Sequence, residues 1–484
     1  DDLNPEISET DAVEMLAQHI ITKPVFDTLF QGNRFTAENA VSKAMETVLS
    51  QIYDRQIDTE SRTLEKFYDS VRRQAEDIVT ATGRQTLILN LYDRFFRNAF
   101  PQMTQKLGIV YTPVEVVDFI IHSVEDVMQE EFGSSLGNDG VHILDPFTGT
   151  GTFISRLLQC GVLSNEQIKR KFKSEIHANE IVLLAYYIAC INIEAVYDDL
   201  VKENQYQSFD GMVLTDTFQL YEQERDMIAK LLPDNSERRT RQKETEITVI
   251  IGNPPYSVGQ TSANDDAQNT EYKNLDSAIE KTYAERSQSQ LMSSLYDSYV
   301  RAYRWASERI KEEGVICYVS NSGFLDKNFA DGMRSCFQDE FSKIIIFNLK
   351  GDVRKDSMTK GSAKEGGNVF GSASMTGVSI NLLVKTKSQT PCEILYYEFP
   401  TALSTKEKLS KIASYQSTKI MKGLGLFSII QPNSKNEWIN QSDPAFDQYT
   451  KISSKTKESV VFNNYSNGVK TQRDAWCYNF SKNR

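Results

Sequence analysis

A short run from Ile250 to Ser257 combines the end of a predicted strand with side chains that could hold an amino group. Apolar residues from Ile247 to Ile251 lead into Asn253, Pro254, Pro255 and an aromatic residue. Two consecutive prolines fix φ and lack backbone N–H groups, so this segment cannot continue the ladder of a sheet. We therefore predict a stiff, extended loop at a strand end.

Such a loop suits an exocyclic amino group, which offers two N–H donors and no strong acceptor. Asn253 Oδ1 and the Pro254 carbonyl oxygen could each accept one of these hydrogen bonds. The amino nitrogen would then become more nearly tetrahedral and expose its lone pair, while Tyr256 stacks on the ring that carries it. The alternative interpretation is a Pro-Pro turn that only closes a buried strand.

A second stretch, Asp145-Pro-Phe-Thr-Gly-Thr-Gly, lies between a predicted strand and a predicted helix. Its glycines allow a tight turn and a close approach of the backbone to a ligand. The third glycine of a dinucleotide-binding turn is missing, and the Asp stands where a pyrophosphate would be repelled. The pattern favours a ligand with positive charge or hydroxyl groups, such as S-adenosylmethionine; the alternative is a structural turn. We assign to this ligand Asp145, Pro146, Phe147, Gly149 and Gly151.

Two acids further along could complete a nucleoside site. Glu180 ends a predicted strand and could accept two ribose hydroxyls, although it lies 35 residues after Asp145, where roughly 20 is typical. It could instead place a negative charge at the start of the helix predicted from Ile181. Asp216 could accept the amino group of the cofactor's adenine, with Phe218 packed nearby.

Composition restricts the other possibilities. The 484 residues carry a net charge of −12, which argues against a purely electrostatic nucleic-acid binder. Residues 401–484 nevertheless hold 13 Lys and Arg against 6 Asp and Glu, a basic excess compatible with a DNA footprint. Six cysteines without C-x-x-C spacing and four histidines without metal-ligand spacing predict no metal site. With no signal peptide and no apolar run near 18 residues, we expect a cytoplasmic protein outside the membrane.

Residues 1 to about 105 have helical periodicity and no catalytic constellation, and strands and helices alternate from about 106. The predicted helices are 113–131, 151–159, 180–196 and 291–312. The predicted strands are 141–145, 174–178, 247–251, 315–320, 343–348 and 378–384. This alternation predicts an α/β fold with a doubly wound, mostly parallel, Rossmann-like sheet. We expect polar loops at 233–246, 257–290 and 351–377, and a separate module of short strands and turns after about 386.

The glycine turn at Asp145, followed 108 residues later by Asn253-Pro-Pro-Tyr, resembles the DNA methyltransferases that modify adenine N6. The segment from Gly108 to Val117 is similar to the one that precedes the glycine turn in the γ arrangement of these enzymes. That resemblance implies a site-specific, S-adenosylmethionine-dependent adenine methyltransferase that flips the target base out of the duplex. It also implies that the methionine end of the cofactor is lined by Tyr111, Thr112 and Pro113.

Stretches that begin at Glu180 and at Ser466 resemble the methyltransferase of single-chain Type ISP restriction–modification enzymes. The resemblance implies a coupler at 1–105, a methyltransferase at 106–386 and the start of a target-recognition domain at 387–484. It implies as partners double-stranded DNA and the nuclease and ATP-dependent translocase domains of a parent polypeptide. Because the chain lacks G-x-x-x-x-G-K-[ST] and starts with Asp, we expect a fragment whose recognition domain is incomplete.

The remaining candidates concern contacts with the nucleic acid. Phe370 could stack on the free face of the flipped base, or it could be a core aromatic that follows a loop. Basic residues of the last segment could contact phosphates, namely Lys451, Lys455, Lys457 and Arg473. Rival functions are a protein glutamine-amide methyltransferase, an RNA adenine methyltransferase and a non-catalytic subunit that reads DNA.

Overall fold

The structure is a computed structural model of the 484-residue chain. It describes residues 17, 19–20, 39–52, 69, 73, 112–202, 206–222, 232–255, 272–289, 292–352, 365–371, 374–387, 390–400, 402–450, 452 and 459–462. By their internal contacts, residues 1–438 form one unit and residues 439–484 another. In the second unit, a 3₁₀ turn spans Pro444–Gln448 and the backbone N–H of Phe462 donates to the carbonyl of Ile452.

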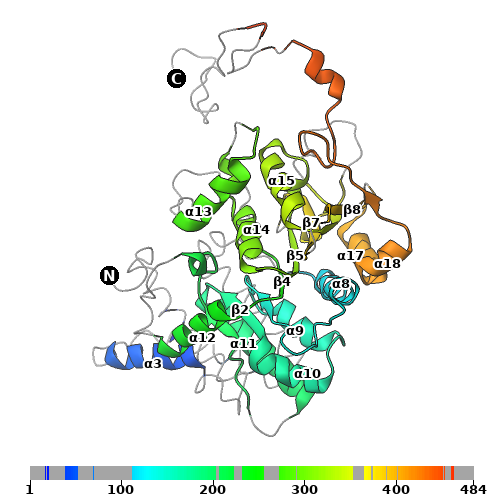
Figure 1. Ribbon diagram of the computed structural model, residues 1–484. Coiled ribbons are helices and arrows are strands. Elements are labelled where there is room, and N and C mark those ends of the chain that lie inside the picture. The colour runs from blue at the N-terminus through cyan, green and yellow to red at the C-terminus, as the bar shows by residue number, and fades with distance from the viewer. Residues whose placement is uncertain are drawn as a thin grey trace, which may run out of the picture. The chain divides into compact units, whose positions relative to one another are not determined.

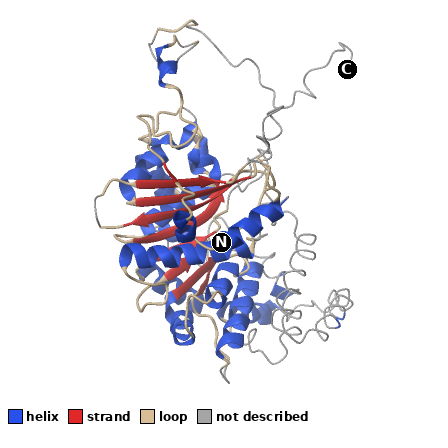
Figure 2. Ribbon diagram, turned by 90° about the vertical axis from the view of Figure 1, so that its right-hand side faces the viewer, coloured by secondary structure: helices blue, strands red, loops and turns tan. Residues whose placement is uncertain are grey.

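A nine-stranded sheet runs through the described part of the first unit, in the order β3-β2-β1-β4-β5-β7-β6-β8-β9 (Figures 1 and 2). The first five strands are parallel to one another, and β7 enters antiparallel between β5 and β6. Their bounds are β1 Ile143–Asp145, β2 Ile176–Glu180, β3 Met212–Leu214, β4 Val249–Gly252, β5 Gly314–Asn321, β6 Lys343–Lys350, β7 Val378–Lys385, β8 Glu393–Glu398 and β9 Ser428–Ile429.

Helices cover both faces of the sheet (Figure 2). In one set α8 contacts α9, which contacts α11, and in another α13 contacts α14. The described α-helices are α3 Ala40–Ile52, α8 Val114–Phe132, α9 Thr152–Gln159, α10 Asn165–Arg170, α11 Leu183–Val201, α12 Pro233–Glu244, α13 Lys273–Ile279, α14 Ser298–Arg309, α15 Asp331–Glu340, α17 Thr405–Tyr415 and α18 Thr418–Gly423. None of these described helices is long and apolar enough to cross a membrane.

Helix α8 shows how the sequence produces an element that positions the site. Apolar residues recur at helical spacing along it and are buried, among them Val116, Ile120 and Val124. Pro113 stands just before the helix, where a missing N–H costs little, and the helix stops at Gly133 in a left-handed conformation. Its start therefore fixes the segment that carries Thr112 and Pro113.

The predicted doubly wound α/β fold is confirmed, with local differences. The strand predicted at 174–178 lies two residues later, and β3 was not predicted because three residues are too few for periodicity to show. The loop predicted at 233–246 is wrong, because it contains α12 with Pro233 in its first turn. Part of the loop predicted at 257–290 is α13 followed by a π-helix at Glu280–Ala284.

The sheet also continues past 386, where we expected a separate module to begin. Strand β8 pairs in parallel with β6 from Lys343↔Glu393 to Asn348↔Glu398. Buried Lys408 of α17 donates from Nζ to the carbonyl of Leu349 at 2.7 Å, which ties that helix to the end of β6. The structural unit thus extends to Trp438, while the functional division at 386 stays a prediction.

Two described residues of the N-terminal region, His19 and Asn39, contact α11, and α3 packs against α12. His19 Nδ1 is 3.0 Å from the hydroxyl of Tyr187, and Asn39 Nδ2 donates to the hydroxyl of Tyr186 at 3.4 Å. Both tyrosines are buried, as are most residues of α11. A helix that is buried on nearly all sides is apolar around most of its circumference. The helical prediction for 1–105 is met at α3, and most of that region lies outside the described residues.

Close packing of α15 against the π-helix at Glu280–Ala284 generates a stability prediction. A Cβ at Gly332 would overlap the carbonyl oxygen of Tyr283, a backbone atom that cannot swing away. Gly332→Ala should therefore destabilise the fold by about 1–3 kcal/mol, measured as the free energy of unfolding in urea. Gly423→Ala is the matched control, because a Cβ at that helical glycine meets nothing within 4 Å. Equal unfolding midpoints for the two variants would contradict this packing.

Candidate functional site at the carboxyl edge of the sheet

Three of the predicted residues come together where the strand order reverses. Asp145 is the last residue of β1, Glu180 is the last residue of β2, and Asn253 directly follows β4. Strand β1 pairs in parallel with both β2 and β4, so these residues share one edge. In open α/β sheets, the crevice at such a switch point is the usual place for a ligand.

The glycine turn is held against β2 and α11. The backbone N–H of Thr148 donates to the carbonyl of Asn179 at 3.0 Å. Gly149 and Gly151 both have positive φ, at 57° and 84°, a region that side chains with a Cβ disfavour. A Cβ at Gly151 would also lie 3.1 Å from the Cα of Ala189, whereas one at Gly149 would meet open space. Glycine is thus required by conformation at the first position and also by packing at the second.

The carboxylate of Glu180 is hydrogen-bonded to the glycine turn. Its Oε2 accepts the N–H of Gly149 at 2.8 Å, and its Oε1 accepts the N–H of Val182 at 2.8 Å. Burial raises the pKa of this carboxyl to about 7. A carboxylate has about four acceptor positions, so capacity remains for hydroxyl donors. The bond to Val182 also serves the turn before α11, so the structure accommodates both interpretations of Glu180.

Asp145 is fully buried beside the glycine turn. Its Oδ1 accepts the N–H of Phe147 at 3.1 Å, and its Oδ2 has no hydrogen-bond partner within the described part of the chain. Burial raises its pKa to about 8, and the neighbouring charge of Glu180 adds to that rise. A Cβ at Gly252 would lie 2.8 Å from Oδ1, so the glycine before Asn253 makes room for this carboxylate.

The side chain of Asn253 is oriented by the segment that precedes α8. Its Nδ2 donates to the hydroxyl of buried Thr112 at 3.1 Å. Its Oδ1 is buried and has no partner among the residues that the structure describes. Pro254 is buried and Pro255 is partly exposed, as expected for a loop held against the strand end. Tyr111 and Tyr256 lie outside the described residues, so their predicted roles stay predictions.

An aromatic cluster adjoins Asp216. The ring of Phe218 packs against Phe147 at a centroid distance of 5.5 Å and against Tyr272 at 5.2 Å. The hydroxyl of Tyr272 donates to Asp216 Oδ2 at 2.8 Å. Sequence reasoning missed Tyr272, which belongs to no motif. The apolar side chain of Ile181, directly after Glu180, is 51% exposed.

Of the candidates for nucleic-acid contact, the structure describes Phe370. Phe370 is buried, and its N–H donates to Asn368 Oδ1 at 2.9 Å within a turn. Its proposed contact with a base stays a prediction, as do those of four basic residues outside the described residues, Lys451, Lys455, Lys457 and Arg473. No group of metal-binding side chains occurs in the part of the chain that the structure describes.

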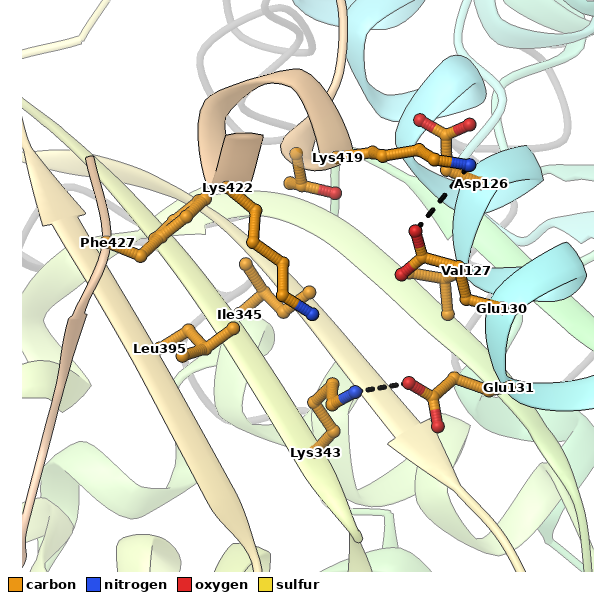
Figure 3. A pocket seen from close by; sticks show the side chains of 11 residues that line it. Asp126, Val127, Glu130, Glu131, Lys343, Ile345, Leu395, Lys419, Lys422 and Phe427 are labelled. Carbon is orange, nitrogen blue, oxygen red and sulfur yellow. Dashed lines mark hydrogen bonds and ion pairs between the residues drawn. The ribbon is translucent and has the colours of Figure 1, made fainter. Parts of the chain in front are cut away.

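A small pocket elsewhere contains none of the predicted site residues (Figure 3). Its apolar floor includes Ile345 of β6 and Leu395 of β8. Ion pairs stand at its rim, Lys343 with Glu131 and Lys419 with Glu130. These contacts join α18 and β6 to α8, and we assign the pocket a structural role.

Two regions of the chain match models of known protein families. Residues 1–83 match the family model described as the coupler domain of Type ISP restriction-modification enzymes. Residues 154–352 match the model of the Eco57I restriction-modification methylase. This chain carries the coupler and methylase regions of the Type ISP restriction–modification family. No curated protein matches it.

Two solved structures of Type ISP enzymes agree with the family models, and a third DNA complex is also similar. The chain is 44% identical to the ATP-dependent enzyme LlaBIII bound to DNA, with a TM-score of 0.92 over 99% of this chain and 33% of that one. It is 44% identical to a nuclease-deletion mutant of LlaGI in complex with a DNA substrate mimic, with a TM-score of 0.89 over 98% and 38%. The DrdV–DNA complex is 33% identical, with a TM-score of 0.87 over 98% and 46%. The chain therefore spans less than half of the length of each of these proteins.

The Thr112–Asn253 hydrogen bond in this Type ISP methylase region leads to a prediction. Thr112→Val removes the acceptor of the Asn253 amide and leaves a partly buried N–H unpaired, which costs about 1–3 kcal/mol. Methyl transfer at saturating cofactor should fall by roughly 5- to 100-fold. Thr112→Ser keeps the hydroxyl and should retain most of the rate. A Thr112→Val rate equal to that of Thr112→Ser would show that this bond does not orient Asn253.

Proposed function

We propose that this chain transfers a methyl group from S-adenosylmethionine to the N6 amino group of an adenine in double-stranded DNA. The observation that carries the proposal is the Asn253 amide, whose nitrogen is bound by Thr112 while its oxygen is buried without a partner among the described residues. Asn253 directly follows β4, which pairs with the strand that ends at buried Asp145. An acceptor held there suits an incoming N–H donor and has no evident use in the fold.

The residues around the glycine turn fit the proposed cofactor. The unpartnered Asp145 Oδ2 suits a cation, as the α-amino group of the cofactor is. Glu180 keeps acceptor capacity for ribose hydroxyls, and the ring of Phe218 beside Asp216 suits an adenine. When bound, S-adenosylmethionine supplies an electrophilic methyl group on its sulfonium. Asp145 therefore suits the positive charge of the cofactor, Glu180 its ribose hydroxyls, and Phe218 with Asp216 its adenine ring.

The chain's own contribution to the reaction is orientation and polarisation. Asn253 Oδ1 and the Pro254 carbonyl would accept the two N–H groups of the target amine and turn its lone pair toward the methyl group. Extruding the base from the duplex costs a few kcal/mol, and stacking on Tyr256 would offset part of that. No covalent enzyme intermediate is needed.

Double-stranded DNA is favoured as the substrate over RNA or a protein amide. The relatives LlaBIII and LlaGI were determined with DNA or a DNA mimic, and the basic excess in residues 401–484 suits phosphate contacts. We further propose that this chain acts as the modification part of a longer restriction–modification enzyme. Its partners would be an ATP-dependent motor and a nuclease, in keeping with the two relatives' titles.

The decisive experiment follows tritium from labelled S-adenosylmethionine into duplex DNA, with RNA and protein in parallel arms. Label should enter DNA at adenine N6, and Asn253→Ala should abolish the transfer while cofactor affinity stays within about threefold, since Asn253 contacts the substrate amine. Asn274→Ala is the matched control, because the side chain of this asparagine of α13 is exposed and has no role in the proposed reaction. Label in RNA or protein instead of DNA, or near-normal transfer by Asn253→Ala, would overturn the proposal.

The raised pKa of Asp145 predicts proton release when the cofactor binds. With a pKa of about 8 in the free protein, this carboxyl is mostly protonated at pH 7. A cation placed beside it favours the ionised form, so binding should release up to about one proton at pH 7 and fewer above pH 9. Calorimetry in buffers of different ionisation enthalpy measures this number.

Asp145→Asn is the control for this measurement and should remove most of the release. Glu180, whose pKa is about 7, should contribute a smaller share that Glu180→Gln removes. The same proton count in wild type and Asp145→Asn would show that Asp145 does not face the cation.

A further inference from the structure

Tyr272 lies at the start of α13, 56 residues after Asp216 in the chain, yet the two side chains meet at the proposed site. The hydroxyl of Tyr272 donates to Asp216 Oδ2 at 2.8 Å. Tyr272 is buried, and its ring stands at 69° to the ring of Phe218. The tyrosine thus joins the acid that we assign to the adenine with the aromatic ring beside it.

Several contacts fix the position of this tyrosine. The guanidinium of Arg301 lies over its ring, 5.1 Å from the centroid. Arg301 in turn makes a two-point contact with Asp276, at 2.8 and 2.7 Å. Glu222 accepts the backbone N–H groups of Asn274 at 2.9 Å and of Leu275 at 3.1 Å, which anchors the first turn of α13. A hydroxyl held so firmly can orient the carboxylate that it contacts.

The acceptor positions of Asp216 are correspondingly restricted. Its Oδ1 accepts the N–H of Phe218 at 2.9 Å, and its Oδ2 accepts the hydroxyl of Tyr272. Burial raises the pKa of Asp216, and the hydrogen bond from Tyr272 opposes that rise by stabilising the ionised form. With both oxygens bonded, the carboxylate cannot rotate freely. Its remaining acceptor capacity points in a fixed direction.

We propose that Tyr272 is a positioning residue that holds Asp216 as a hydrogen-bond acceptor for the amino group of the cofactor's adenine. This inference rests on the proposed S-adenosylmethionine site. An ionised, oriented acceptor pairs with an amino group and repels the carbonyl oxygen that hypoxanthine carries at the same place. Without Tyr272, Asp216 can rotate and bind a proton more readily, and it can then donate to that carbonyl. Tyr272 thus sets the preference for adenine over hypoxanthine.

The test compares the affinities of the full 484-residue chain for S-adenosylhomocysteine and S-inosylhomocysteine by calorimetry. Wild type should prefer the adenosyl compound, and Tyr272→Phe should lower the ratio of the two affinities by about tenfold. Tyr283→Phe is the matched control, because the buried hydroxyl of Tyr283 has no partner among the described residues. Its ratio should equal that of wild type. In an Asp216→Ala background, Tyr272→Phe should leave the ratio unchanged.

The other outcomes overturn the inference in distinguishable ways. An equal loss of affinity for both compounds in Tyr272→Phe would make the tyrosine a structural support for α13. A gain for both would make its hydroxyl a competitor of the ligand. A changed ratio in the Asp216→Ala background would show that Tyr272 does not act through Asp216. A folded wild-type chain that binds neither compound would overturn the cofactor proposal itself, whatever the variants do.

Discussion

The organisation of this protein depends on keeping two buried oxygen atoms available at one edge of its sheet. Asp145 Oδ2 and Asn253 Oδ1 lack partners within the described residues, and each such atom costs about 1–3 kcal/mol in a folded protein. A small side-chain rotation cannot bring either atom to a new partner, because the second polar atom of each group is already hydrogen-bonded. Asp145 Oδ1 accepts from Phe147, and Asn253 Nδ2 donates to Thr112. The parallel strands β1 and β4 hold both groups at the switch point, and the large core of the sheet offsets this local cost.

Helix α11 connects this edge with the N-terminal region that matches the coupler model. On one side, Asn192 donates from Nδ2 to the carbonyl of Thr150 at 2.9 Å, and Ala189 packs against Gly151. On another side, Tyr187 meets His19 at 3.0 Å. One helix therefore contacts both the glycine turn and the N-terminal residues. This explains why most of α11 is buried.

The site is assembled from segments that are far apart in the chain. Thr112 and Asn253 are separated by 141 residues, and Gly149 and Glu180 by 31. In each pair a backbone or side-chain N–H donates to an oxygen of a distant segment. The order of the strands therefore determines where the residues proposed to bind the cofactor and the substrate lie. The 44% identity to Type ISP enzymes extends over nearly the whole chain, which agrees with a site spread along the sequence.

The sequence by itself determined the elements whose evidence is local. Asn-Pro-Pro-Tyr must end a strand because proline cannot join a ladder, and the glycines of the Asp145 turn need positive φ. Periodicity then predicted the doubly wound α/β sheet, and the motifs pointed to a methyltransferase. Only the tertiary structure decided that β8 joins the sheet, that Thr112 binds the Asn253 amide and that Tyr272 reaches Asp216. These contacts join residues between 50 and 141 positions apart, and a local pattern of residue types does not specify which distant partner each side chain meets.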